Sequence, residues 1–185
     1  MTVDKYILDK NNAALLIIDI QERLVVVMDK KEMVVRNTLH LVELAKMQNI
    51  PVVVTEQYPK GLGKTLPEIQ AALPAYLPVE KVSFNCCGEA SFNEQMKRLG
   101  KKKIIVTGME THICVLQTGL GLIKAGFDVH LVVDAVCSRT KANWRSAIEL
   151  IRDAGGVVTN TETALFQLLG VAGTPEFKTI SNRIK

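Results

Sequence analysis

Cys114 combines a reactive side chain with a position that suits nucleophilic chemistry. It lies in the stretch 108–115 (GMETHICV), which joins a segment typical of a buried strand, 103–107, to a segment with helical spacing, 115–125. The amide groups at the start of a helix favour negative charge and lower the pKa of a thiol. We interpret Cys114 as a candidate thiolate nucleophile; the alternative is a small buried hydrophobic residue.

Two charged residues also follow predicted strands. Asp19 comes directly after the apolar run 13–18, and Lys81 lies near the end of a short predicted strand, 78–82. Taken singly, the first is typical of a turn and the second of a solvated charge. Together with a thiol they predict catalysis, because Asp19 can accept the thiol proton and return it to a leaving group, while Lys81 stabilises both anions.

The elements that must position these residues alternate between strand and helix. Further strands are predicted at 51–54, 104–107, 127–133 and 157–159, and helices at 31–48, 66–73, 89–99, 113–125, 141–154, 161–169 and from 174 onward. Repeated strand–helix units predict an α/β fold in one domain, 1–185, with a mainly parallel sheet between helices. Ligands bind at the carboxyl ends of such strands, where all three residues are expected. The irregular segment 56–78 is long enough to suggest a functional loop.

Composition excludes several classes of protein. The chain of 185 residues is 48% hydrophobic and has a net charge of +4, with no basic tract and only 5% aromatic residues, so we expect no nucleic-acid partner. Its longest apolar runs are about six residues, too short to cross a bilayer, and the N-terminus lacks a hydrophobic signal core. We expect a cytoplasmic protein with reduced cysteines and no membrane partner.

Three blocks of the sequence resemble the signature blocks of the isochorismatase-like cysteine hydrolases, a family that includes nicotinamidases and carbamoylsarcosine amidases. They are residues 17–21 (IIDIQ), 81–84 (KVSF) and 106–115 (VTGMETHICV), in that family's order and spacing. The resemblance runs from about residue 12 to residue 170 and is greatest to the small isochorismatase-domain proteins of unassigned substrate. It implies a Rossmann-like, three-layer α/β/α fold with a six-stranded parallel sheet.

The resemblance also assigns roles. It implies that Cys114 is the nucleophile, Asp19 the general acid and base, and Lys81 the electrostatic partner of both. It implies a cis peptide bond between Met109 and Glu110, and an oxyanion hole made by the backbone amides of Glu110 and Cys114. Members of the family commonly self-associate, so a homo-oligomer is expected.

Departures from the family pattern narrow these expectations. Metal-binding nicotinamidases carry an Asp-x-His set after the second strand, where this chain has 55–57 (TEQ), so no metal and no other cofactor is expected. Elsewhere in the chain, we expect His40 to be a surface residue and His130 to be a structural one. True isochorismatases lack the nucleophilic cysteine, so Cys114 argues against vinyl-ether hydrolysis.

Five residues are weaker candidates for contact with a small-molecule substrate. They are Gln21, Gln57, Tyr58, Phe84 and His112, and for Gln21, Phe84 and His112 a capping or packing role is at least as well supported. The sequence as a whole predicts a metal-independent cysteine hydrolase that cleaves a small amide-like substrate through a thioester. The alternative is a non-catalytic binding or scaffold protein with the same fold. A nucleotide-binding domain is disfavoured because no Gly-rich phosphate loop follows the first strand.

Overall fold

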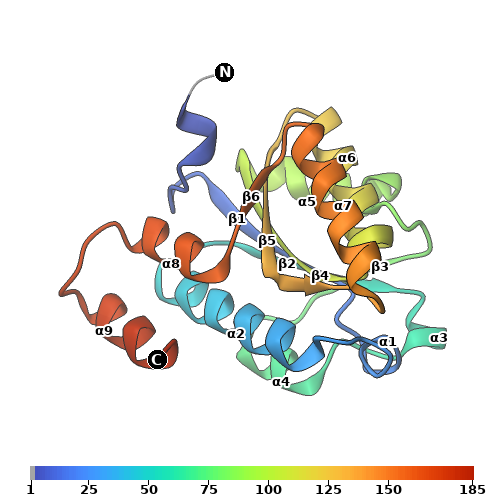
Figure 1. Cartoon of the computed structure of the whole chain (residues 1–185), viewed down its shortest axis with the longest axis horizontal. Coiled ribbons are helices and arrows are strands. Elements are labelled where there is room, and N and C mark those ends of the chain that lie inside the picture. Colours follow the sequence, from blue (N-terminus) through green and yellow to red (C-terminus); the bar gives the residue numbers. More distant parts are fainter. Residues whose placement is uncertain (1–2) are drawn as a thin grey trace.

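The computed structural model describes residues 3–185 and is built around one six-stranded parallel sheet (Figure 1). Its strands lie in the order β3-β2-β1-β4-β5-β6, so the chain reverses direction across the sheet between β1 and β4. The strands are β1 Ala13–Ile18, β2 Val52–Gln57, β3 Val79–Lys81, β4 Lys103–Met109, β5 Asp128–Cys137 and β6 Val157–Thr159. Such a reversal leaves a crevice at the carboxyl ends of the two strands.

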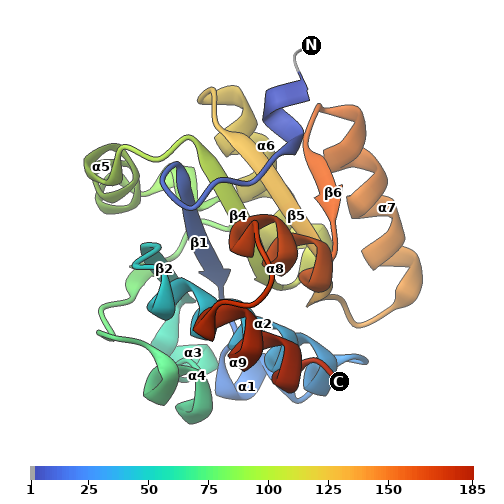
Figure 2. The same cartoon turned by 90° about the vertical axis from the view of Figure 1, so that its left-hand side faces the viewer.

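Helices cover both faces of the sheet and complete the predicted three-layer fold (Figure 2). One face packs against α2, α4, α8 and α9, and the other against α5, α6 and α7. The α-helices are α1 Glu22–Val25, α2 Lys31–Met47, α3 Pro59–Leu62, α4 Pro67–Ala72, α5 Ala90–Leu99, α6 Leu116–Lys124, α7 Lys141–Asp153, α8 Thr161–Leu169 and α9 Pro175–Arg183. Short 3-10 helices lie at Val3–Tyr6 and Cys86–Gly88.

The apolar run of β1 is explained by its central place. Leu15 and Ile17 point into the core beneath α2, whereas Leu16 and Ile18 point into the core beneath α6. Both faces of the strand are therefore buried, and alternation of polar and apolar residues is lost, as is usual in parallel sheets. No helix in residues 3–185 combines the length and apolar character needed to cross a membrane.

The structure differs from the predicted elements mainly near the site. A π-helical turn, Thr111–Val115, replaces the start of the predicted helix at 113, and α6 begins only at Leu116. The strand predicted to end at 133 continues to Cys137, with a shift in its register against β4 between Val106 and Gly108. The helices α1 and α3 were not predicted because one short turn carries no periodic signal.

Gly108 is required by the close approach of two strands at this point. Its φ is +121°, and a Cβ atom there would lie 2.0 Å from the carbonyl oxygen of Ile18. Any other residue would push β4 away from the end of β1. The glycine thus lets the segment that carries Cys114 lie against the segment that carries Asp19.

Candidate active site

The structure brings Asp19, Lys81 and Cys114 together at the carboxyl edge of the sheet. Asp19 follows β1, Lys81 ends β3, and Cys114 lies in the π-helical turn after β4. Their side chains are buried, with exposed fractions of 0%, 3% and 4% for the whole residues. The Lys81 Nζ donates to Asp19 Oδ2 at 2.7 Å, so the carboxylate and the ammonium form a buried ion pair.

β2 lies between the strands that carry Asp19 and Lys81, and two of its residues join the ion pair. Thr55 Oγ1 donates to Asp19 Oδ1 at 2.6 Å, and Gln57 Oε1 accepts from Lys81 Nζ at 2.6 Å. These residues are two apart in the strand and so share one face. Thr55 was not among the predicted site residues. It could have been found from its spacing, because it lies two residues before Gln57 at the end of a buried strand and so shares the face of Gln57.

Gln57 links the ammonium to the thiol. Its Nε2 donates to the carbonyl of Val82 at 2.8 Å, which turns its Oε1 toward Lys81. The thiol of Cys114 donates to the same Oε1 at a distance of 4.0 Å. The structure therefore places Gln57 within the charged network, where it orients Lys81 as well as bordering the thiol.

Gln21 holds the loop that follows β2. Its Oε1 accepts from the Gln57 amide at 2.7 Å, and its Nε2 donates to the carbonyls of Gln57 at 3.0 Å and Gly63 at 2.7 Å. The side chain is fully buried and its hydrogen-bonding capacity is largely used. Its observed role is to fix the backbone beside the site.

Asp19 has a left-handed backbone conformation, with φ of +53°. Its amide donates to the carbonyl of Thr55 at 3.2 Å, and its carbonyl accepts from the Gln21 amide at 2.9 Å, which makes a tight turn. Such a φ is uncommon outside glycine, although Asp and Asn adopt it more readily than other residues. Residues held in such conformations cluster at functional sites.

The electrostatics of the thiol differ from the expectation. Burial, and next the negative charge of Asp19, raise the pKa of Cys114 well above that of an ordinary thiol, although Lys81 acts in the opposite direction. Burial disfavours the ammonium of Lys81, but attraction by Asp19 and Cys114 outweighs this and raises its pKa. The expected lowering at a helix start is thus wrong for the resting site, where a neutral thiol faces a charged pair.

The other predicted features of this segment, the cis peptide bond and His112, lie around the charged network. The Met109–Glu110 peptide bond is cis, and the Glu110 carboxylate accepts from Arg139 Nε at 3.0 Å. Both ring nitrogens of His112 are engaged, with Ser138 Oγ at 3.0 Å and Asn143 Nδ2 at 3.3 Å. In this arrangement His112 fastens the π-helical turn to its neighbours.

Tyr58 and Phe84 are exposed beside the site. Their exposed fractions are 54% and 53%, and the Tyr58 amide donates to the carbonyl of Lys81 at 2.8 Å. Tyr58, Lys81 and Val82 line a cavity of about 380 Å³ on this side of β3. Tyr58 therefore lies beside Lys81, whereas Asp19 and Cys114 do not line this cavity.

Glu56 stands in the block where metal-binding nicotinamidases carry ligands, but its side chain is on the opposite face of β2 from Gln57. Its Oε1 accepts from the amide of Thr65 at 2.6 Å, from the Thr65 hydroxyl at 2.9 Å and from the Tyr76 hydroxyl. Within residues 3–185, no three His, Cys, Asp or Glu side chains are grouped so that they could hold a metal ion. The donors of Glu56 give it a structural role in fastening the segment 65–76.

The two other histidines were predicted from their elements alone. His130 is buried in β5, and burial, together with the charge of Lys103, lowers its pKa to about 4. His40 was expected at the surface, which is wrong: only 9% of the residue is exposed, because this face of α2 is covered by neighbouring segments.

Comparisons with known proteins identify the family of the chain. A family model described as the isochorismatase domain matches residues 13–163. The chain is 40% identical over 179 residues to the secreted isochorismatase effector Isc1 of Phytophthora sojae, which covers 95% of this chain and 85% of that protein. It is 36% identical over 174 residues to isochorismatase domain-containing protein 2 of Danio rerio, covering 94% of this chain and 87% of that protein.

Solved structures show the same fold. The MAR1 ribonuclease of Caenorhabditis elegans superimposes with a TM-score of 0.89 at 33% identity, covering 96% of this chain and 91% of that one. YcaC of Pseudomonas aeruginosa, determined with hexane-2,5-diol and covalent acrylamide, gives 0.90 at 27% identity with the same coverage. YcaC of Escherichia coli, described as an octameric hydrolase of unknown specificity, gives 0.90 at 28% identity, covering 96% and 90%. The chain described above belongs to the isochorismatase family.

Proposed function

We propose that this protein is a metal-independent cysteine hydrolase that cleaves the C–N bond of a small amide-like substrate through a thioester. The observation that carries the proposal is the buried Asp19–Lys81 ion pair, which shares Gln57 with the Cys114 thiol. Burying two charges costs desolvation energy that their attraction often fails to offset. A charged pair retained beside a thiol is better explained by chemistry than by stability.

The first half of the reaction forms the thioester. Asp19 accepts the thiol proton while the Cys114 sulfur attacks the substrate carbonyl carbon, and a C–S bond forms. The backbone amides of Glu110 and Cys114 donate to the resulting oxyanion, as amides at the start of a helical turn lack partners within it. The tetrahedral intermediate then collapses, the C–N bond breaks, and the amine or ammonia leaves with the proton from Asp19.

The second half releases the acid. Asp19 accepts a proton from a water molecule, whose oxygen attacks the thioester carbonyl. The C–S bond breaks, the carboxylic acid leaves, and the Cys114 sulfur regains a proton from Asp19. The raised pKa of Cys114 fits this cycle, because the thiol stays neutral until a substrate carbonyl is in place and Asp19 is ready to take the proton.

Lys81 serves both halves electrostatically. Its raised pKa keeps it charged at neutral pH, so it stays paired with the Asp19 carboxylate before the reaction and offsets the charge that develops on sulfur. Gln57 and the carbonyl of Ser83, which accepts from Lys81 Nζ at 3.3 Å, keep the ammonium in place. The structure of the relative from Pseudomonas aeruginosa carries covalent acrylamide, so a protein of this fold presents a nucleophile to a small amide-bearing molecule.

We also propose that the chain self-associates. The relative from Escherichia coli is described as octameric, and here Leu120 of α6 and Leu150 of α7 are exposed by 38% and 50%. Light scattering on the purified protein measures its mass directly. A monomer at all concentrations would contradict this proposal and would leave the catalytic one unaffected.

The proposed reaction is tested with a panel of small primary amides and release of ammonia as the readout. Turnover should be lost in Cys114→Ser, and mass spectrometry of the quenched wild-type enzyme should find the acyl group on the peptide that contains Cys114. Cys87→Ser is the matched control, since that thiol is half-buried outside the charged network. Full turnover by Cys114→Ser would overturn the mechanism. Saturable binding of an amide without turnover or an acyl adduct would favour the non-catalytic alternative.

A further inference from the structure

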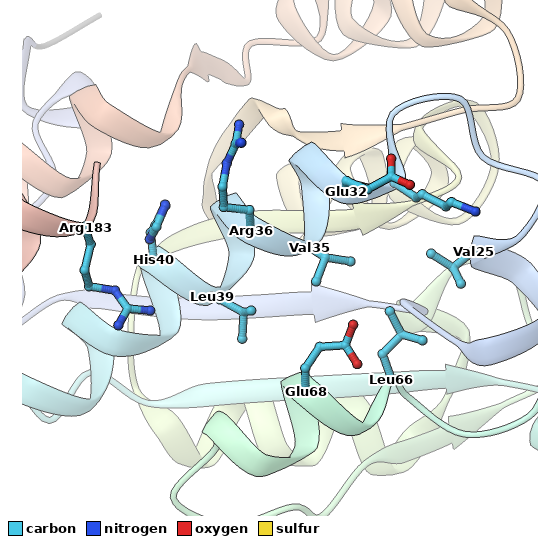
Figure 3. Close-up of a pocket in the computed structure, with 10 residues that line it drawn as sticks. Val25, Glu32, Val35, Arg36, Leu39, His40, Leu66, Glu68 and Arg183 are labelled. Carbon is cyan, nitrogen blue, oxygen red and sulfur yellow. The ribbon is translucent and has the colours of Figure 1, made fainter. Parts of the chain in front are cut away.

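A second candidate site lies on the other side of α2 from the sheet. A cavity of about 510 Å³, within the size range of small-molecule sites, opens between α2, α4 and the end of α9 (Figure 3). Figure 3 shows Val35 and Leu39 of α2 pointing toward Leu66 and Glu68 of the facing segment. Most of the exposed lining is apolar, so an apolar strip runs along the middle of the cavity.

Three nitrogen-bearing side chains lie at one end of this strip. They are Arg36 and His40, one turn apart on α2, and Arg183 from α9. The same three residues also line an adjoining cavity of about 310 Å³, so they stand between two spaces. A ligand in the first cavity would therefore meet a cluster of hydrogen-bond donors at this end.

These donors lack adequate partners within residues 3–185. His40 is nine-tenths buried, and its Nδ1 has no hydrogen-bond partner there. Arg36 forms no ion pair in the described chain, and Arg183 makes only one long contact, 4.0 Å to Glu43 Oε2. Arg36 and Arg183 are exposed and can be hydrated, so His40 is the one buried member of the cluster without a partner in the part of the chain that the structure describes. Buried polar groups are nearly always paired, which makes His40 the member whose partner is missing. Burial and the charges of Arg183 and Arg36 lower the pKa of His40. The same two positive charges would attract an anion to this end of the cavity.

Two carboxylates limit which anion fits. Glu32 of α2 and Glu68 of α4 line the same cavity, and Figure 3 shows Glu68 reaching in from the wall opposite Leu39. Lys31 also lines the cavity, but a second negative charge near Glu68, which faces Leu39, would be repelled. The cluster therefore favours a single charge at one end of an apolar molecule and disfavours a dianion such as phosphate.

We propose that this cavity binds a small monocarboxylic acid with a short hydrocarbon chain. Its carboxylate lies against Arg183 and His40, with Arg36 at the rim, and its hydrocarbon lies on Val35, Leu39 and Leu66. An arginine can bind a carboxylate through two parallel hydrogen bonds, and the neutral ring of His40 supplies a further donor. The site holds none of the residues of the proposed reaction.

The experiment is an NMR titration of the whole protein with sodium hexanoate, with hexanamide and inorganic phosphate in parallel. Saturable shifts are expected for residues of α2, α4 and α9 with hexanoate, and weaker or no binding with the other two. The affinity for hexanoate should fall at least about fivefold in Arg183→Gln, the loss expected for a charged hydrogen bond. Arg152→Gln, which removes the same charge from α7, should bind as wild type does.

Other results would overturn the proposal. Equal binding of hexanoate by Arg183→Gln and wild type would remove the cluster as the carboxylate site, and no saturable shift in the millimolar range would remove the site itself. Hexanoate that shifts Cys114 and its neighbours, and is displaced by alkylation of that thiol, would place the acid in the active site. Equal binding of hexanamide would show that only the apolar strip binds. Turnover is not part of this test, so its failure leaves the proposed reaction standing.

Discussion

The charged groups at the carboxyl edge of the sheet and those at the outer face of α2 are arranged in opposite ways. Asp19 and Lys81 are buried, paired and hydrogen-bonded on every side. Arg36 and Arg183 are exposed cations with at most one long ion pair in the described chain, and the buried His40 beside them has no partner for its Nδ1. The first cluster is complete without a ligand and, in the proposed reaction, would move a proton. The second is incomplete and gains most from binding an anion.

The largest effect is expected when the proposed base is removed. Asp19→Asn keeps the shape and the hydrogen bond from Thr55 but cannot accept the thiol proton. A general base contributes about 10²- to 10⁴-fold, so kcat for amide hydrolysis should fall by that factor. Stopped assays of ammonia release measure it. A variant that retains wild-type kcat would remove Asp19 from the reaction.

Removing the cation of the Asp19–Lys81 pair should lower the free energy of unfolding. Lys81→Met leaves the Asp19 carboxylate buried without its cation, and such losses cost about 3–5 kcal/mol in the free energy of unfolding. Urea denaturation followed by circular dichroism measures the change.

The double variant Asp19→Asn with Lys81→Met is the control for this loss. It removes both charges and should recover part of the stability. If the single variant unfolds as wild type does, the pair is not buried as the structure has it.

The thiol should respond to the same pair. Because burial and Asp19 raise the pKa of Cys114, its alkylation by iodoacetamide should be slow at pH 7 and still rise above pH 9. In Asp19→Asn the negative charge is absent, the pKa falls, and alkylation at a given pH becomes faster. Mass spectrometry of the separate cysteine peptides gives the rates, with half-buried Cys87 as reference. A plateau below pH 8 in wild type would show a resting thiolate.

Much of the fold followed from the sequence because it depends on strong local signals. The strand at Val157–Thr159 and the helix at Thr161–Leu169 have the predicted bounds, set by flanking glycines and an Asn160 cap. The edge shared by Asp19, Lys81 and Cys114 followed from parallel strand order. The end of β5 did not, because its continuation to Cys137 depends on pairing with β4 after a shift in register.

The second cluster could not be predicted from local patterns. Arg36 and His40 are one turn apart, but the third member, Arg183, is brought to them only when α9 packs along α2. His40 was expected to be exposed for the same reason, since nothing nearby in sequence indicates what covers it. The sign of the pKa shift at Cys114 also escaped prediction, because it depends on the depth of burial beside Asp19.

A smaller effect is expected at Gln21, which fastens the loop beside the first cluster. Gln21→Ala removes three hydrogen bonds and leaves the buried Gln57 amide without its acceptor. We expect a loss of about 1–3 kcal/mol in the free energy of unfolding. Gln48→Ala, which removes one half-buried hydrogen bond at the far end of α2, is the matched control and should cost less. Equal losses would mean that the hydrogen bonds between Gln21 and the Gln57 backbone contribute no more to stability than the single hydrogen bond of Gln48.

The smallest effect on stability is expected for the second cluster, at the outer face of α2. Removing Arg183 should leave stability within about 0.5 kcal/mol of wild type, because no strong partner is lost. It should also raise the pKa of His40 toward its ordinary value, since a nearby positive charge is gone and burial alone still lowers it. Glu32, Glu43 and Glu68 remain in place in this variant, so the shift reports on the arginine. An NMR titration of the His40 ring measures it. A pKa unchanged by Arg183→Gln would mean that the three side chains do not act as one cluster, and a carboxylate would then have no reason to prefer that end of the cavity.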